Sequence, residues 1–501
     1  MSVSTPTTGA TEAAGGLRRV LPFRTIVSAS TGLAYAAISL LSCVQLAAFL
    51  AGDSAWIALL IAGALALLAA LCFSELNALY PSAAAIRQYI RAAFNERSSL
   101  TITYGYVLTI IAVIAADSYV VGRAITYVTD YFHLPGVPVL VWIFLLLALA
   151  AFANLLGIKI AGLLQDVTTF ALLISLAAMS LIALAHGGFQ LHQPFAALHQ
   201  PGNLFNAVAV GVFTFSAFEW VTPLSEEVND TRQIPRGMFV SLGLLFISYA
   251  LFTVACTNLI GIQHLCANIG ADNQICSAVP QMQLGQAALG SVGVVWMLVA
   301  TLFTGVMTFN GGFATASRFL YAAAREATLP DIFARLSDRL VPWVTVVALA
   351  ASSALIAVLV DLTQSYNTLI LVGAVLEGLI YAAAGLCVIR LRRRAPDAPR
   401  SFRIPGGWTV PILAILIFSA LALAAALNIS PSGAIQPLPL LITLLVFALS
   451  FIYVQTVVPR LKAQAEAKRR ALGSRRPRRP PPAPAATEET TTTEDTPGGE
   501  A

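Results

Sequence analysis

Charged side chains are scarce in this chain of 501 residues. Asp, Glu, Lys and Arg make up 11% of the residues, whereas apolar residues make up 58%. A soluble globular protein is near half apolar and about a quarter charged. Apolar runs of about twenty residues recur along the chain, and runs of this kind span membranes as helices because lipid leaves no partner for an unpaired backbone. The composition therefore excludes a soluble catalytic domain and predicts an all-α polytopic membrane protein.

The chain also lacks the residue clusters that metal sites and nucleophilic catalysis require. Its six cysteines show no metal-ligand spacing, and its five histidines form no catalytic constellation. We therefore expect no metal, no cofactor and no enzyme activity. Cys266 and Cys276 share one loop and could either form a disulfide or remain free. The first 16 residues carry no apolar segment of a signal peptide, so the first apolar run is predicted to be a retained span.

Lys and Arg are unevenly distributed between the connecting segments. The apolar runs predict twelve membrane-spanning helices, near residues 26–50, 53–73, 101–128, 137–156, 161–185, 203–225, 237–261, 288–317, 342–360, 366–389, 408–428 and 436–458. All but Arg123 of the 29 Lys and Arg residues lie in alternate connections. The positive-inside rule then places both termini in the cytoplasm of a plasma-membrane protein. The net charge of +5 follows from this topology, so no nucleic-acid partner is expected.

The same pattern divides the chain into a membrane domain and two tails. Residues 1–25 are predicted to be a cytoplasmic N-terminal tail, and residues 26–458 the twelve-helix domain. Residues 459–501 form a C-terminal tail that is first basic and then rich in Pro, Thr and Glu, a composition typical of disorder. The basic part could bind anionic lipid headgroups of the bilayer, or the whole tail could simply be solvated.

Five ionisable residues lie inside predicted spans, where charge is costly and therefore a functional signal. Arg123 and Asp166 lie near span ends, where they could reach the interface or pair with a neighbouring charge. Asp117 and Glu377 lie nearer mid-span, so they either act in function or make interhelical hydrogen bonds. Glu219 is the strongest candidate of the five.

Glu219 coincides with a predicted helix break. Pro223 has no N–H to donate to the carbonyl of Glu219, and its ring clashes with that carbonyl. A broken helix at membrane depth is tolerated only inside protein or beside a wet cavity, and such breaks form the sites of secondary transporters. The acids that follow, Glu226 and Glu227, are expected to be solvated or paired with Arg232 and Arg236.

The first span has a possible counterpart to this break. The segment VSASTGLAY (27–35) places hydroxyl groups and Gly32 early in an apolar helix. The hydroxyls could satisfy freed carbonyl groups, and glycine gives the backbone latitude. The alternative is a helix start with small packing residues.

Four segments together resemble the permeases of the amino acid–polyamine–organocation (APC) superfamily. VFTFSAFEWVTPLSEEVNDTRQIPRG (212–237) is similar to the family's sixth-span signature, and FSELNALYPSAAAIRQYIRAAF (73–94) to the segment after its second span. SRFLYAAAREATLPDIFARLS (317–337) and SFRIPGGWTVPIL (401–413) resemble the segments after the eighth span and before the eleventh. The resemblance covers residues 20 to 458. The four segments together are specific to the family, whereas no single one would be.

The resemblance implies a fold and an activity. The fold would be a 5+5 inverted repeat with discontinuous first and sixth helices, followed by two extra helices. The activity would be secondary active transport of amino acids or related organic amines, by proton-coupled symport or by exchange. A desolvated carboxyl group at the site would be a candidate to carry the proton.

The resemblance also implies a role for each matched residue. Glu219 matches the acid implicated in coupling and gating, and Asp117 and Glu377 are further candidates for that role. The residues that match the substrate-binding positions are Ser30, Thr31, Gly32, Phe213, Ser216, Ala217 and Phe218. Among them, Phe213 matches the aromatic that closes over substrate.

This chain departs from the family pattern at several of these positions. The first-span loop keeps one glycine, Ala217 replaces the glycine before the acid, and the fifth span has no lysine in its apolar core. The acids Asp117, Glu219 and Glu377 leave room for a cationic or carboxylate-free amine. The alternatives are an inorganic cation transporter or channel on the same scaffold, and a receptor that does not transport.

Overall fold

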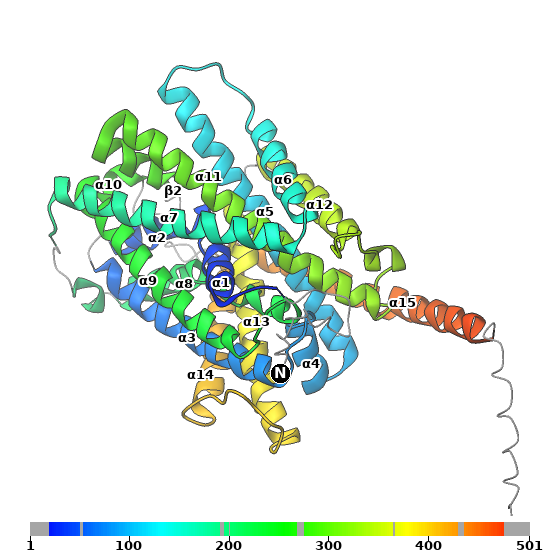
Figure 1. Cartoon of the computed structure of the whole chain (residues 1–501). Coiled ribbons are helices and arrows are strands. Elements are labelled where there is room, and N and C mark those ends of the chain that lie inside the picture. The colour runs from blue at the N-terminus through cyan, green and yellow to red at the C-terminus, as the bar shows by residue number, and fades with distance from the viewer. Residues whose placement is uncertain are drawn as a thin grey trace, which may run out of the picture.

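Long helices build almost the whole molecule (Figure 1). The computed structural model describes residues 20–50, 54–190, 195–199, 201–267, 275–363, 366–428 and 435–474. The long helices are α3 (Ala55–Leu79), α5 (Glu96–Tyr131), α6 (Val139–Leu155), α7 (Ile158–Gly187), α9 (Gln233–Leu259), α11 (Pro280–Arg325), α12 (Trp343–Thr363), α13 (Tyr366–Arg394), α14 (Thr409–Leu427) and α15 (Leu438–Ser474). Helix α11 is kinked at Gly290, whose backbone is not helical.

Two further spans are broken in the middle. The first consists of α1 (Phe23–Ala34) and α2 (Ala37–Phe49), which are bent by 54° at the residues between them. The second consists of α8 (Pro201–Thr214) and the 3-10 helix η2 (Phe218–Glu226). The breaks therefore fall in the first and sixth predicted spans.

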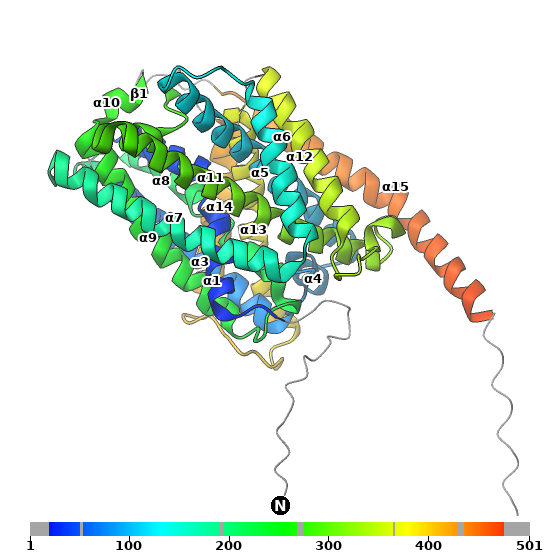
Figure 2. The ribbon, with the colours of Figure 1, turned by 45° about the horizontal axis from the view of Figure 1, so that its top comes forward.

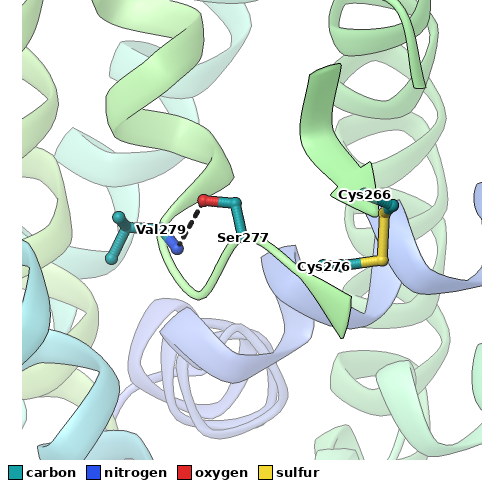
Figure 3. The surroundings of a disulfide bond; sticks show 4 residues. All are labelled: Cys266, Cys276, Ser277 and Val279. Carbon is teal, nitrogen blue, oxygen red and sulfur yellow. Dashed lines mark hydrogen bonds between the residues drawn. A yellow bond between two sulfur atoms is a disulfide. The ribbon is translucent and has the colours of Figure 1, made fainter. Parts of the chain in front are cut away.

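Short elements complete the described chain. They are α4 (Ile86–Ala93), α10 (Ile262–Leu265), the 3-10 helices η1 (Ala196–His199) and η3 (Asp331–Ala334), and the strands β1 (Cys266–Ala267) and β2 (Ile275–Cys276). The strands pair antiparallel with Cys266 opposite Cys276. These two cysteines form a disulfide that closes the loop between α10 and α11 (Figure 3), which decides between the two alternatives that the sequence left open.

Each predicted span coincides with a long helix or a broken pair. In the described part of the chain, ten helices are long and apolar enough to cross a membrane, or eleven if α1 and α2 form one span. Helix α6 is apolar but has only 17 residues. The all-helical membrane architecture is confirmed, whereas the count of twelve and the inverted repeat stay predictions.

The broken spans lie inside the bundle and are covered by other helices. Helix α1 packs against α7, α9, α11 and η2, and α2 packs against α8 and α9. In the most apolar segment of α5, 72% of the residues are buried, against 22% in α15. Helix α15 thus lies at the periphery (Figures 1 and 2), with leucines such as Leu441 and Leu445 on its exposed side, as expected of a lipid-facing helix.

The two ends of the bundle carry different parts of the chain. Figure 2 shows the start of α1 and the end of α15 at one end, and α10 with β1 at the other. Helix α15 continues to Ser474, beyond the predicted span end at residue 458, and Lys468 pairs there with Asp331 at 2.9 Å. Residues 1–19 and 475–501, which include most of both predicted tails, lie outside the described residues.

Candidate functional site

The sixth span breaks just before Glu219. Helix α8 ends at Thr214, and residues 215–217 form a turn in which Ala217 adopts a left-handed conformation with φ of 73°. The prediction had placed the break at Glu219 itself, through Pro223. Instead Pro223 lies inside η2. In a 3-10 helix the N–H of a residue at this position would donate to the carbonyl of Trp220, but proline has no N–H. The hydroxyl of Thr315 donates to that carbonyl at 2.7 Å in place of the missing N–H.

The first span breaks later than predicted. It unwinds at Tyr35 and Ala36, whereas Ser30, Thr31 and Gly32 lie inside α1. A Cβ atom at Gly32 would lie 2.5 Å from the hydroxyl oxygen of Thr169 on α7. The role of Gly32 is therefore close packing of α1 on α7, the alternative that the sequence had left open.

Hydroxyl groups join the two broken spans to each other and to α9. Ser30 Oγ donates to the carbonyl of Phe218 at 2.7 Å. The carbonyl of Ala34, at the end of α1, accepts from Tyr249 Oη at 2.8 Å and from Ser39 Oγ at 3.0 Å. The predicted use of hydroxyls for freed carbonyls thus applies to Ser30, although its partner belongs to the other broken span.

The start of α2 is capped by a carboxylate from a different helix. Asp117 of α5 is fully buried, and its Oδ1 accepts from the N–H of Ile38 at 3.0 Å. A helix N-terminus has unpaired N–H groups and a positive partial charge, which a carboxylate stabilises. Asp117 therefore occupies the positive end that the first break creates.

Glu219 is fixed by two tyrosines from other helices. Tyr106 Oη of α5 donates to Oε1 at 2.6 Å, and Tyr381 Oη of α13 donates to Oε2 at 2.7 Å. All three side chains are buried. Neither tyrosine was predicted from the sequence. Tyr381 follows Glu377 by one helical turn, so their shared face was a usable signal, but nothing local marks Tyr106.

Glu377 lies beside Glu219, with Tyr381 and the backbone N–H of Ala217 as further neighbours. Its side chain is 4% exposed, and neither carboxyl oxygen has a hydrogen-bond partner among the described residues. The two acidic side chains interact with each other. A buried carboxyl group with few well-placed donors is costly, so Glu377 is the less well satisfied of the two acids.

A pocket of about 410 Å³ leads from one end of the bundle to Glu377. It extends from Cys276, Asn428 and Gln436 to Ser216 and Glu377, between α2, α8, α13 and α14. Phe213 lines it, as does the ring of Tyr381. Of the predicted site residues, Phe213, Ser216 and Glu377 thus line the pocket. The others are buried and do not line it, namely Ser30, Thr31, Gly32, Asp117, Ala217, Phe218 and Glu219.

The opposite end of the broken spans is closed by a buried ion pair. Arg318 of α11 donates to both carboxylate oxygens of Glu227, at 3.0 and 3.1 Å, and both side chains are 2% exposed. The backbone carbonyl of Glu227 accepts from Val20 and Leu21, before α1. The predicted partners Arg232 and Arg236 were wrong, because helix α11 brings a closer cation from far along the chain.

The remaining charged candidates, Asp166 and Arg123, lie outside the site. Asp166 pairs with Arg24 at 3.1 Å and accepts from Thr25 and Ser28, which fastens α1 to α7. Arg123 is exposed on α5. Among the described residues there is no group of three or more His, Cys, Asp or Glu placed to hold a metal ion.

The family model and the curated relatives that match this chain all describe amino acid permeases or transporters. The model of a family described as amino acid permease matches residues 22–450. The chain is 26% identical over 379 residues to the large neutral amino acids transporter small subunit 2 of Rattus norvegicus, covering 72% of this chain and 67% of the relative. It is 25% identical over 387 residues to the branched-chain amino acid permease BcaP of Bacillus subtilis, covering 73% of this chain and 79% of the relative.

A solved structure shares the fold. A manganese transporter of Eremococcus coleocola superposes with a TM-score of 0.58 at 15% sequence identity, covering 90% of this chain and 94% of that one. This likeness supports the arrangement of helices and nothing finer.

Proposed function

This chain belongs to the amino acid permease family, and from that premise we propose that it is a secondary active transporter of amino acids or related organic amines. It would act in the cytoplasmic membrane by alternating access, with proton symport or exchange. The observation that carries the proposal is the pocket that ends at Glu377, beside the break in the sixth span. A one-sided pocket beside two broken helices is the arrangement by which such transporters hold substrate near mid-membrane.

Each part of the site has a proposed role. Phe213 would cover the substrate, and Ser216 and the carbonyl groups at the end of α8 would replace its hydration water. Glu219 and Glu377 would respond to a proton or a cation. The Glu227–Arg318 pair would keep the far side shut while the pocket is open. Movement of one group of helices against the other would then close the pocket on one side of the membrane and open the site to the other side.

The charge distribution supports the proposed orientation. The alternation of Lys and Arg predicts both termini in the cytoplasm. The pocket, which reaches Cys276 and Gln436, would then open to the outside. The basic residues at the end of α15, such as Lys462, would lie near anionic lipid headgroups.

The two alternatives have weaker support. An inorganic cation transporter or channel on this scaffold would need several convergent ligands, whereas the described pocket offers one carboxylate and aromatic walls. A receptor without transport would bind solute and move none. Saturable flux that solute on the opposite side accelerates would argue against both alternatives.

Uptake into proteoliposomes that contain the purified full chain tests the proposal. Phe213→Ala should lower uptake about tenfold, equivalent to about 1.4 kcal/mol of lost binding, because an aromatic wall of the pocket is removed. Glu219→Gln should change the dependence of uptake on pH, because one proton-binding group is removed. The matched controls are Phe205→Ala, on the exposed side of α8, and Glu466→Gln on the exposed part of α15. Wild-type rates and pH profiles in both test variants would overturn these roles.

A further inference from the structure

The break in the first span already holds a carboxylate of the protein itself. The start of a half-helix in mid-membrane is the natural binding point for an anionic group of a substrate. Here the N–H of Ile38, in the first turn of α2, is taken by Asp117. Asp117 belongs to α5 and is fully buried, so the protein itself supplies the anion at this terminus.

The described lining of the pocket has no basic side chain with which to hold a carboxylate. Glu377 is the one Asp, Glu, Lys, Arg or His among those residues, and the polar side chains beside it, such as Gln45, Asn206 and Thr368, are neutral. The internal segments outside the described residues contain no Lys or Arg either. A carboxylate in this pocket would therefore lose its water and gain no counter-ion, and Glu377 would repel it.

The same pocket has the features that an organic ammonium group requires. Glu377 is buried, and neither of its oxygens accepts a hydrogen bond of good geometry from the described residues. The rings of Phe213, Tyr381 and Phe418 also line the pocket, and the centroids of the last two lie 5.0 Å apart. Aromatic faces attract a cation through their quadrupoles, and the attraction grows when water is excluded.

We propose that the substrate of this site is an organic amine that has no carboxylate, with Glu377 as its counter-ion and Asp117 as the group that closes the carboxylate-binding end of α2. This inference rests on the proposed transport function and makes it narrower. The apolar lining residues, among them Phe49 and Leu421, suit an amine with an aliphatic or aromatic body.

Counterflow with matched pairs of solutes tests the substrate class. Proteoliposomes are loaded with one unlabelled solute, and exchange is measured with the labelled form. The pairs are phenylalanine with 2-phenylethylamine, leucine with 3-methylbutylamine, and lysine with 1,5-diaminopentane. We expect at least one amine to exchange about tenfold faster than its parent amino acid, since an unpaired buried carboxylate is strongly penalised.

The outcomes separate this inference from the broader proposal. If the amino acids exchange and the amines do not, the inference is overturned and the transport function stands. If no amino acid and no amine exchanges, the transport function falls and this inference falls with it.

Variants test the two acids separately. Glu377→Gln should reduce amine exchange about 30-fold or more, as removal of one partner of a buried charge pair does, and Glu377→Asp should retain more activity than Glu377→Gln. Asp117→Ala should raise the ratio of amino acid to amine exchange, because it frees the N–H of Ile38. Asp117→Asn is the substitute if Asp117→Ala is unstable. It retains an acceptor oxygen for that N–H, so the ratio of amino acid to amine exchange should rise less.

Asp130→Asn, at an exposed carboxylate near the end of α5, is the matched control and should leave both rates unchanged. Monodisperse elution and an unchanged melting temperature show that each variant is folded. Wild-type amine exchange in a folded Glu377→Gln variant would overturn the role of Glu377. An unchanged exchange ratio in both Asp117 variants would overturn the role of Asp117.

Discussion

Single residues decide how the sixth span is broken. Ala217 adopts a left-handed conformation at the turn between α8 and η2. A residue with a Cβ atom pays about 1–2 kcal/mol for this conformation. The strain is retained because Ser30 holds the carbonyl of the next residue, Phe218, and two tyrosines hold Glu219. The neighbouring residues thus fix a backbone that alanine alone would avoid.

Ala217→Gly is expected to stabilise the protein by about 0.5–1 kcal/mol, because relief of the strained φ outweighs the greater freedom of glycine in the unfolded chain. The measurement is thermal unfolding of the purified protein in detergent. The control is Ala207→Gly, at a buried helical position of α8, which should destabilise by about 0.5–1 kcal/mol. A melting temperature for Ala217→Gly below that of the wild type would contradict the strain.

At the scale of elements, neighbouring acids in one loop have different tasks. Glu227 is buried and bound by Arg318 of α11, and its backbone holds the chain before α1. Glu226 is 24% exposed, accepts from the N–H of Ala83 at 3.0 Å, and lies 3.7 Å from Arg325. The Glu227–Arg318 pair joins three elements at the closed end of the broken spans. The Glu226–Arg325 pair is partly exposed and lies at the edge of that end.

Glu227→Gln should therefore destabilise the fold by about 3 kcal/mol, because it leaves the charge of Arg318 buried without a counter-ion. Glu226→Gln should cost less than about 1 kcal/mol, as expected of a partly exposed pair. Thermal unfolding compares the two variants. The double variant Glu227→Leu with Arg318→Met should recover much of the loss, since it removes both charges. Equal losses of stability in Glu227→Gln and Glu226→Gln would show that the buried pair contributes no more to stability than the partly exposed one.

At the scale of the whole molecule, the breaks, the pocket and the closed end form one system. The pocket approaches the breaks from the end that carries the disulfide, and the Glu227–Arg318 pair closes the other end. Alternating access requires that these two ends face opposite sides of the membrane. The orientation of the molecule is thus part of the proposed function.

Labelling of single introduced cysteines tests that orientation. Leu134→Cys, in the exposed connection between α5 and α6, should react with a membrane-impermeant thiol reagent in intact cells. Arg335→Cys, in the exposed connection between α11 and α12, should react only after the cells are permeabilised. The native cysteines give a low background, because four are buried and two form the disulfide. The reverse pattern of labelling would invert the proposed topology.

The sequence by itself determined the membrane class, the approximate helices and the family. These follow from composition and local pattern, because the thickness of the bilayer fixes the length of a span and lipid penalises charge inside it. The sequence also singled out Glu219 and Glu377, since acids in apolar runs stand out. The resemblance placed the unwound part of the sixth span correctly, at Ser216, Ala217 and Phe218. The local signals Pro223 and Gly32 pointed to positions a few residues away from the breaks, because they do not show which packing contacts compensate for an unwound backbone.

Only the tertiary structure decided which groups meet at the site. The phenols that hold Glu219 come from positions 113 and 162 residues away in the chain. Asp117 reaches the start of α2 across 79 residues, and Arg318 reaches Glu227 across 91. Such partners are chosen by helix packing, in which a small rotation of one helix changes the neighbours of every side chain on it. For that reason Glu377 can be recognised in the sequence as an unusual acid, but only the folded chain shows that the two tyrosines hydrogen-bond to Glu219 and leave Glu377 facing the pocket.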